Sequence, residues 1–262
     1  IAAGEVIDRP AAVVRELLDN AFDAHAEKIK IQFENGGLDE ITIADDGDGI
    51  YFEDLEKAPI KHYTSKIAQF EDIFSIYTMG FRGEALSSIA SVSRMRITSF
   101  NGLETHGGEL VVEGGENFPI KPFVRKKGTT VEVKDLFYNI PARQKFVKSA
   151  MGESRAIKDV IITKTLPYQN TAVEVINSGK TILETKSKTL MERLGEYFAP
   201  TVDVKYLMEI TQPETEHGIK IYGFAGSPQL YYHNRSYQYF YVNNRPITMP
   251  AFYYAVSSVY EG

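Results

Sequence analysis

Residues 9–24 read RPAAVVRELLDNAFDA, and this segment predicts an amphipathic helix. Pro10 suits a first helical turn, because the N–H that proline lacks has no helical partner there in any case. Apolar residues recur along the segment at helical spacing and form a stripe that must be buried against another layer. Glu16, Asn20 and Asp23 lie at positions i, i+4 and i+7, so they project from one face of the helix. Taken alone, that face is either solvated or holds a polar ligand.

The segments after this helix predict a β-sheet. Residues 28–34 and 39–45 alternate apolar and polar side chains around Asn35-Gly36-Gly37, a pattern typical of a hairpin. Further strands are predicted by RMRITSF (94–100), GGELVVEGG (107–115), GTTVEVKDLF (128–137) and the hairpin AVEVINSGKTILET (172–185). A helix is predicted over residues 153–166. Together these elements favour an α+β fold with two layers and a mixed sheet.

The pattern changes near Lys186, where we predict a domain boundary. Beyond it, SKTLMERLGEYF predicts a short helix, IKIYGFAG and SYQYFYVNNRP predict strands, and a last helix starts near Pro250. The sequence therefore predicts a first domain over residues 1–185 and a smaller second domain over residues 186–262, each with a mixed sheet. Because the chain opens on Ile1 within a patterned segment, we expect a fragment of a longer protein.

Composition excludes several classes of function. The 262 residues include no cysteine, which excludes disulfides and thiolate metal sites, and the five histidines are scattered. The formal net charge of −6 means that any nucleic-acid binding must come from a local basic patch. No run approaches the roughly 18 apolar residues that span a bilayer, and no leader-like segment is present, so we expect no membrane association. The phosphate-binding motif GxxxxGK followed by Ser or Thr does not occur.

Two glycine-containing motifs are candidates for ligand contacts. DDGDGI (45–50) places Asp45 at the end of a strand, where a carboxylate accepts a hydrogen bond from an amine, and its glycines allow a ligand to approach closely. GFRGEAL (80–86) predicts a glycine turn that feeds a helix, whose N–H groups and neighbouring Arg82 suit an anion. A surface turn and a plain loop-to-helix junction remain the alternatives when each motif is taken alone.

The combination of motifs is more specific than any one of them. ELLDNAFDA, DDGDGI, YTSK, GFRGEAL and GTT occur in that order along the chain. In this combination the sequence resembles the MutL family of DNA mismatch-repair ATPases, part of the superfamily that includes gyrase, heat-shock chaperone ATPases and histidine kinases. IAAGEVIDRPAAVVRELLDNAFDA (1–24) and GFRGEALSSIASVSR (80–94) are similar to the family's own signatures. The resemblance covers nearly the whole chain and is weakest over residues 101–125 and 186–235.

The resemblance implies a two-layer α/β sandwich ATPase domain with the Bergerat-type nucleotide fold, followed by a smaller ribosomal-protein-like α/β domain. It implies a Mg²⁺-dependent switch that binds ATP, hydrolyses it slowly and couples mismatch recognition to DNA repair. Glu16 would be the general base, Asn20 the Mg²⁺ ligand, and Asp23 a support on the same helix face. Asp45 would bind the adenine amino group, in a purine pocket shaped by Gly47, Gly49, Ile50 and Thr129.

The resemblance also assigns residues to the phosphates and to DNA. The triphosphate would lie against Gly80, Phe81, Arg82, Gly83, Glu84, Ala85 and Leu86, and Thr64, Ser65 and Lys66 would belong to a lid. Arg245, in YVNNRP, matches a position in a basic DNA groove of the family, and Arg143, with Lys145 and Lys148, is a second candidate. Asp46 stands where many relatives carry Asn, and we expect it to face solvent or the pocket rim with little consequence.

The implied partners are a MutS-type mismatch sensor, DNA, and a second MutL subunit in a homodimer or a heterodimer. The absence of cysteine and the compact length favour a bacterial cytoplasm over a eukaryotic nucleus. The family supplies a phosphate-binding lysine from a segment that reads like HPxKxEVRF, which these 262 residues do not contain. In the family, residues that would precede Ile1 join two subunits. Without those residues and that lysine, we expect this fragment to be monomeric, to bind ATP and to hydrolyse it poorly.

Two other functions remain as alternatives. The first is a histidine kinase or type II topoisomerase subunit of the same superfamily. The scattered histidines disfavour the kinase, and the match at GFRGEALSSIASVSR disfavours the topoisomerase. The second is a nucleotide-binding scaffold without catalysis, against which Glu16 argues. Whether the whole protein carries a C-terminal endonuclease stays open.

Overall fold

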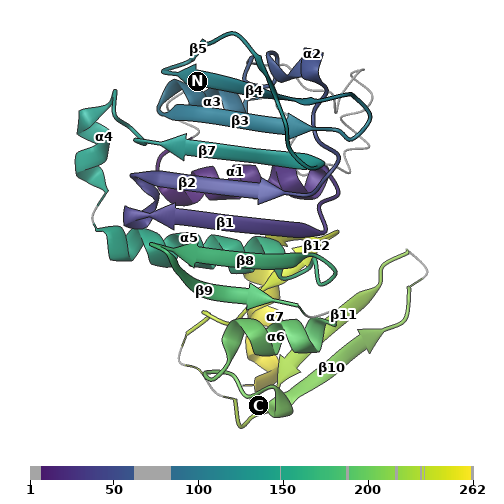
Figure 1. The fold of residues 1–262 in the computed structure, drawn as a ribbon. Helices are drawn as coiled ribbons and strands as arrows, with labels where there is room; N and C mark the ends of the chain where they lie inside the picture. Colours follow the sequence, from purple (N-terminus) through teal and green to yellow (C-terminus); the bar gives the residue numbers. More distant parts are fainter. Residues whose placement is uncertain are drawn as a thin grey trace. The chain divides into compact units, whose positions relative to one another are not determined.

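The computed structural model describes residues 7–61, 84–147, 149–186, 189–215, 218–230, 232 and 234–260 (Figure 1). The chain divides into two compact units. The first unit consists of Ile1–Lys164 and Thr171–Glu184, and the second consists of Thr165–Asn170 and Thr185–Gly262. None of the helices in the described part of the chain is long and apolar enough to cross a membrane.

A mixed sheet forms the first unit. Its strands run in the order β5-β4-β3-β7-β2-β1-β8-β9, and β6 pairs with β4. The bounds are β1 Lys28–Glu34, β2 Glu40–Asp45, β3 Arg94–Phe100, β4 Gly107–Glu113, β5 Glu116–Asn117, β6 Lys121–Phe123, β7 Gly128–Lys134, β8 Ala172–Asn177 and β9 Lys180–Thr185. The β1–β8 pair is parallel, whereas β1–β2, β2–β7, β7–β3 and β3–β4 are antiparallel. The predicted two-layer fold with a mixed sheet is confirmed for this unit.

Helices cover one face of this sheet. The bounds are α1 Pro10–Asp23, the 3-10 turn η2 Asn35–Gly37, α2 Phe52–Leu55, α3 Ala85–Ser91, α4 Pro141–Phe146 and α5 Ala150–Thr165. Figure 1 shows α1 and α5 behind the sheet, and α1 also contacts α3. The apolar stripe of α1 is buried as predicted, with Val13, Val14 and Leu18 fully inaccessible to solvent. Pro10 occupies the first turn.

Two rows of apolar side chains cross the sheet beneath these helices. The strand registers align Val175, Ile31, Ile43, Val131, Ile97 and Leu110 in one row, and Phe33, Ile41, Val133, Met95 and Val112 in the next. All of them are buried, and each contributes about 1.5–3 kcal/mol of hydrophobic free energy. The opposite face carries ion pairs such as those of Arg96 with Glu109 and Glu132. An antiparallel-rich sheet with one solvated face therefore has its core on the helix side.

The second unit contains α6 Leu190–Phe198, the 3-10 turn η4 Val204–Tyr206, β10 Leu207–Gln212, β11 Ile221–Gly226, β12 Phe240–Val242, β13 Arg245–Ile247 and α7 Pro250–Tyr260. Its two strand pairs, β10–β11 and β12–β13, are both antiparallel. The predicted mixed sheet of the second domain is therefore wrong for the described residues, because no parallel pair forms among them. Arg193 of α6 is fully buried and donates to the Gln169 carbonyl at 2.9 Å and to the Tyr197 hydroxyl at 3.2 Å.

Candidate functional site

At one edge of the core of the first unit, the buried face of the sheet carries a row of polar side chains in place of apolar ones. Asp45 of β2 is opposite Thr129 of β7, and Thr129 is opposite Ser99 of β3. Side chains two residues apart on a strand share a face, so this row continues the face of Ile43 and Ile97. Three neighbouring strands thus change from apolar to polar side chains at the same edge of the core.

Asp45 presents one of its two carboxylate oxygens outward. Its Oδ1 accepts hydrogen bonds from the backbone N–H of Gly47 at 2.9 Å and of Thr129 at 3.2 Å. Its Oδ2 has no hydrogen-bond partner among the described residues. Burial raises the pKa of Asp45 to about 6, although the two backbone hydrogen bonds act in the opposite direction. The carboxylate is therefore ionised at neutral pH and can accept a hydrogen bond from a ligand N–H.

Ser99 is a member of this row that the sequence reasoning missed. It is fully buried, and its Oγ lies 2.8 Å from Thr129 Oγ1 and 3.2 Å from the carbonyl oxygen of Gly128. The backbone N–H of Ile50 donates to the same Oγ at 2.8 Å. The signal was present in the sequence, because Ser99 occupies the apolar phase of the alternating strand RMRITSF.

The glycines near this row pack against backbone. A Cβ on Gly47 would lie 2.5 Å from the carbonyl oxygen of Ala24, and one on Gly49 would lie 2.2 Å from that of Phe100. Gly128 has a φ of +121°, and its Cβ would lie 2.1 Å from the Asp45 carbonyl oxygen. The sequence reasoning gave ligand approach as the purpose of the DDGDGI glycines. The structure supplies a second purpose, because they let the loop after β2 close onto its neighbours.

The predicted polar face of α1 lies beside this loop. Glu16, Asn20 and Asp23 are half-buried, while the residues between them are buried. Glu16 Oε1 accepts from Arg15 at 3.2 Å, and the Asn20 carboxamide has no hydrogen-bond partner among the described residues. The C-terminal end of α1 joins the loop, because Asp48 N–H donates to the Ala24 carbonyl at 2.8 Å. A 1.5 Å rise per residue puts Glu16 about 12 Å along the helix from that junction.

A buried ion pair holds α1 against α5. Lys164 Nζ lies 2.7 and 2.8 Å from the two carboxylate oxygens of Asp19, whose side chain is 11% exposed. Burial raises the pKa of Asp19, Lys164 lowers it, and the charges of Glu16 and Asp23 raise it. The sequence reasoning missed this pair. It fixes α1 at Asp19, which lies between Glu16 and Asp23 along the helix.

The fit of Mg²⁺ can be judged from this donor set. No group of three or more histidine or acidic side chains suited to a metal occurs in the described ranges. Mg²⁺ usually takes one or two protein ligands, and water and phosphate oxygens supply the rest. The half-buried, uncommitted carboxamide of Asn20 fits that limited role.

The remaining predicted residues fall into three groups. Glu84, Ala85 and Leu86 are half-buried at the start of α3, whereas Thr64, Ser65, Lys66, Gly80, Phe81, Arg82 and Gly83 lie outside the described residues. Arg143 of α4 donates to the carbonyl oxygen of Ile7 at 2.9 Å and lies 5.5 Å from the centroid of the Phe137 ring. Arg245 is half-buried at the start of β13, opposite Val242. Neither arginine belongs to the polar row.

Asp46 has a structural role that the sequence reasoning did not predict. Although its side chain is exposed, as expected, its Oδ1 accepts from the backbone N–H groups of Glu27 at 2.9 Å and Lys28 at 2.8 Å. These N–H groups belong to the start of β1. An Asn side chain at this position has a carbonyl oxygen that accepts the same two bonds.

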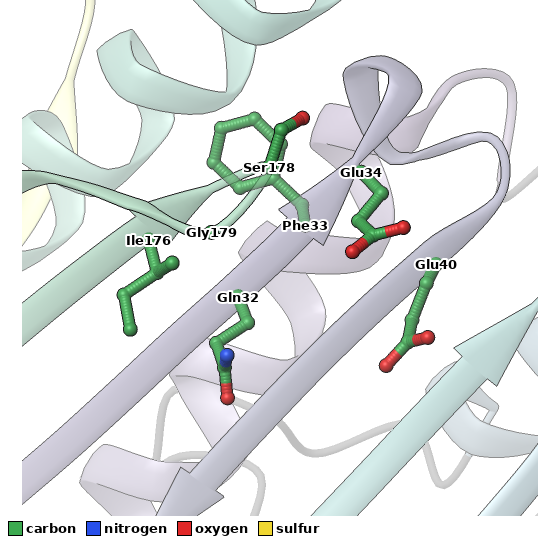
Figure 2. Close-up of a pocket in the computed structure, with 7 residues that line it drawn as sticks. All are labelled: Gln32, Phe33, Glu34, Glu40, Ile176, Ser178 and Gly179. Carbon is green, nitrogen blue, oxygen red and sulfur yellow. The ribbon is translucent and has the colours of Figure 1, made fainter.

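A shallow hollow lies at the other end of β1 and β2. It is lined by Gln32, Phe33, Glu34, Glu40, Ile176, Ser178 and Gly179 (Figure 2). Glu34 and Glu40 are direct cross-strand partners there, and Figure 2 shows both side chains on neighbouring strands. The strand from Glu40 to Asp45 separates this hollow from the polar row by about 17 Å. None of the predicted site residues lines it.

Comparisons with known proteins agree with this geometry. The model for histidine kinase-, DNA gyrase B- and HSP90-like ATPases matches residues 8–109, and the model for the C-terminal domain of the DNA mismatch repair protein matches residues 200–262. The DNA mismatch repair protein MutL of Clostridium tetani (strain Massachusetts / E88) is 42% identical over all 262 residues. The chain belongs to the MutL family. This MutL-family chain spans 42% of the length of that relative.

Solved structures place the MutL-family chain in the same fold. The N-terminal domain of a DNA repair protein superposes with a TM-score of 0.82 and 27% identity, over 99% of this chain and 80% of that one. The Aquifex aeolicus MutL ATPase domain complexed with ADP gives a TM-score of 0.73 and 28% identity, over 97% of this chain and 89% of that one. The predicted ATPase fold is therefore confirmed.

Proposed function

We propose that this chain binds ATP between the polar face of α1 and the polar row of Asp45, Thr129 and Ser99. The observation that carries the proposal is the outward Oδ2 of Asp45, a half-buried carboxylate oxygen without a partner among the described residues, beside the end of α1. The ATPase model covers this region, and the related Aquifex aeolicus domain is complexed with ADP. In this proposal Asp45 accepts from the adenine amino group, and Gly47, Gly49, Ile50 and Thr129 surround the base.

We assign hydrolysis to the other end of the α1 face. Glu16 positions the attacking water and accepts its proton, a role that needs a carboxylate within hydrogen-bond reach. Asn20 holds Mg²⁺, which when bound neutralises charge on the phosphate oxygens. Asp23 supports the same face. Glu84, Ala85 and Leu86 border the phosphates, together with Gly80 to Gly83 and the lid residues Thr64 to Lys66 outside the described ranges.

Glu16→Ala tests this assignment. Turnover should fall by about 10²–10⁴-fold, because a positioned general base contributes about that much, while calorimetry should give an ATP affinity within a few-fold of the wild type. Glu27→Ala is the matched control, since Glu27 is an exposed glutamate beyond the end of α1. Unchanged turnover in Glu16→Ala would remove Glu16 from catalysis. A wild-type chain that binds ATP but never hydrolyses it would favour the non-catalytic scaffold.

We further propose that ATP operates a slow switch in mismatch repair. Binding and hydrolysis would change contacts with a MutS-type sensor, with DNA and with a second MutL subunit. This rests on the family membership of a chain that spans 42% of its Clostridium tetani relative. Arg245 is the candidate DNA contact in the second unit.

Arg245→Glu tests the DNA contact. It should weaken DNA binding and lower its salt dependence, because binding with one phosphate contact fewer releases fewer counterions from the DNA. The affinity for ATP should not change. Arg235→Glu makes the same charge change at an exposed position of the same unit and is the control. Equal DNA affinities for the two variants would exclude Arg245 as a specific contact.

A further inference from the structure

Ser99 connects three elements at the polar row. Its side chain has no exposed surface, and its Oγ contacts the backbone N–H of Ile50, the carbonyl oxygen of Gly128 and the hydroxyl of Thr129. The three distances are 2.8, 3.2 and 2.8 Å. The hydroxyl is therefore fully committed inside the protein.

The directions of these hydrogen bonds follow from counting protons. A serine hydroxyl has one proton to donate and two lone pairs to accept with. Ile50 N–H uses one lone pair, and the Gly128 carbonyl can only accept, so it takes the proton of Ser99. All three contacts are hydrogen bonds only if Thr129 donates its own proton to Ser99. Thr129 Oγ1 is then left with lone pairs alone for a ligand.

The neighbouring donors of the network are also directed inward. The N–H groups of Gly47 and Thr129 donate to Asp45 Oδ1, and that of Ile50 donates to Ser99. The acceptor capacity of the row that these hydrogen bonds leave unused is on the Oδ2 of Asp45 and on the Oγ1 of Thr129. Both atoms are acceptors.

We propose that Ser99 is a positioning residue for nucleotide specificity: by taking the proton of Thr129 it turns the row into an acceptor-only surface that selects a base with a 6-amino group over one with a 6-carbonyl group. The proposal deepens the ATP site proposed above and rests on it. Adenine carries an N–H donor at position 6, whereas hypoxanthine and guanine carry a carbonyl acceptor there. A carbonyl oxygen against two acceptors stays unpaired, and unpaired buried polar groups are what give hydrogen-bonding sites their selectivity.

The test compares ATP with inosine triphosphate, which has a carbonyl oxygen in place of the 6-amino group. Dissociation constants of both are measured by calorimetry with Mg²⁺. The wild-type chain should prefer ATP by at least about 100-fold. In Ser99→Ala the Thr129 hydroxyl can rotate and donate to the carbonyl, so the preference should fall by at least about tenfold, mainly through tighter binding of inosine triphosphate.

A double-mutant cycle separates this role from simple structural support. If Ser99 acts through Thr129, adding Ser99→Ala to Thr129→Val should leave the ATP preference of Thr129→Val unchanged. Equal loss of affinity for both nucleotides in Ser99→Ala, or a Ser99→Ala effect that persists in the Thr129→Val background, would overturn the proposal. If Ser99→Ala does not fold, Thr129→Val alone decides, because an unchanged preference there would show that Thr129 is not a selecting acceptor.

The outcomes also separate this proposal from the ATP site itself. A wild-type chain that binds neither nucleotide would refute both. A chain that binds ATP strongly, with a preference unaffected by either substitution, would refute only the role of Ser99.

Discussion

Lys164→Met should destabilise the first unit far more than the loss of a surface charge would. The substitution removes one partner of an ion pair whose side chains are only 13% and 11% exposed, and it leaves the Asp19 carboxylate buried without its cation. Breaking a buried pair in this way typically costs about 3–5 kcal/mol. The pair of Lys30 and Glu174, with side chains 46% and 39% exposed, provides the comparison. Loss of such a surface pair costs about 0–1 kcal/mol.

Urea unfolding measures the difference. Because the chain has no tryptophan, the transition is followed by far-UV circular dichroism and by fluorescence of its 16 tyrosines. With a urea m-value of about 3 kcal/mol/M, Lys164→Met should lower the midpoint by about 1–1.7 M. Lys30→Met should lower it by less than about 0.4 M.

A double variant identifies the cause. Asp19→Asn combined with Lys164→Met removes both charges, so most of the lost stability should return, because the penalty comes from an uncompensated buried carboxylate. The reasoning is refuted if Lys164→Met shifts the midpoint no more than Lys30→Met does. It is also refuted if the double variant is no more stable than Lys164→Met alone.

Three further predictions concern the polar row and its loop. Burial raises the pKa of Asp45 from 3.8 to about 6, so the stability that its protonated carboxyl contributes is complete below pH 3.8 and is lost as the pH rises through 6. ATP binding needs the ionised carboxylate, so the ATP affinity measured by calorimetry should weaken below pH 6. The variant Asp45→Asn should lack that pH dependence. Gly128→Ala should lower the free energy of unfolding in urea by about 3 kcal/mol or more. Gly179→Ala should lower it by about 1 kcal/mol, because Gly179 also has a positive φ but its Cβ would meet nothing within 4 Å. Asp46→Asn should unfold like the wild type, whereas Asp46→Ala should lose about 1–3 kcal/mol, because only the amide keeps an acceptor for the two N–H groups of β1.

Elements with a strong local pattern could be predicted from the sequence. The helix predicted over residues 9–24 is α1, Pro10–Asp23, and the hairpin at Asn35-Gly36-Gly37 joins β1 and β2. The alternation of KIKIQFE matches the burial of β1 residue by residue. In such segments the burial of one face and the turn residues favour the same structure, so local information is sufficient.

Elements without such a pattern were missed. LMEITQ forms β10, but five of its six residues are exposed, so no buried apolar face marks it in the sequence. The six-residue helix α4 has no buried residue, and its local signals are limited to Pro141 at the start and the basic Arg143 and Lys145 in the last turn. Tertiary neighbours that the sequence does not reveal complete both elements.

The site was predictable in its motifs but not in its connections. DDGDGI pointed to Asp45 because the carboxylate and the glycines are adjacent in the chain. The partners of the site residues come from far along the sequence, since Ser99 lies 49 residues from Ile50 of that motif and Lys164 lies 145 residues from Asp19 of α1. The strand order, which places β7 between β3 and β2, brings Ser99 into the row with Asp45, and the packing of α1 beside α5 brings Lys164 to Asp19.

Because the polar row is assembled from three strands, the site depends on how those strands are aligned. A shift of β7 by a single residue relative to β2 would turn Thr129 to the solvated face and bring a neighbour with different chemistry opposite Asp45. Insertions in the loop between β6 and β7 leave that alignment intact, whereas one extra residue within β7 abolishes it. Nucleotide affinity therefore serves as a sensitive gauge of correct strand pairing in refolded or redesigned versions of this sheet.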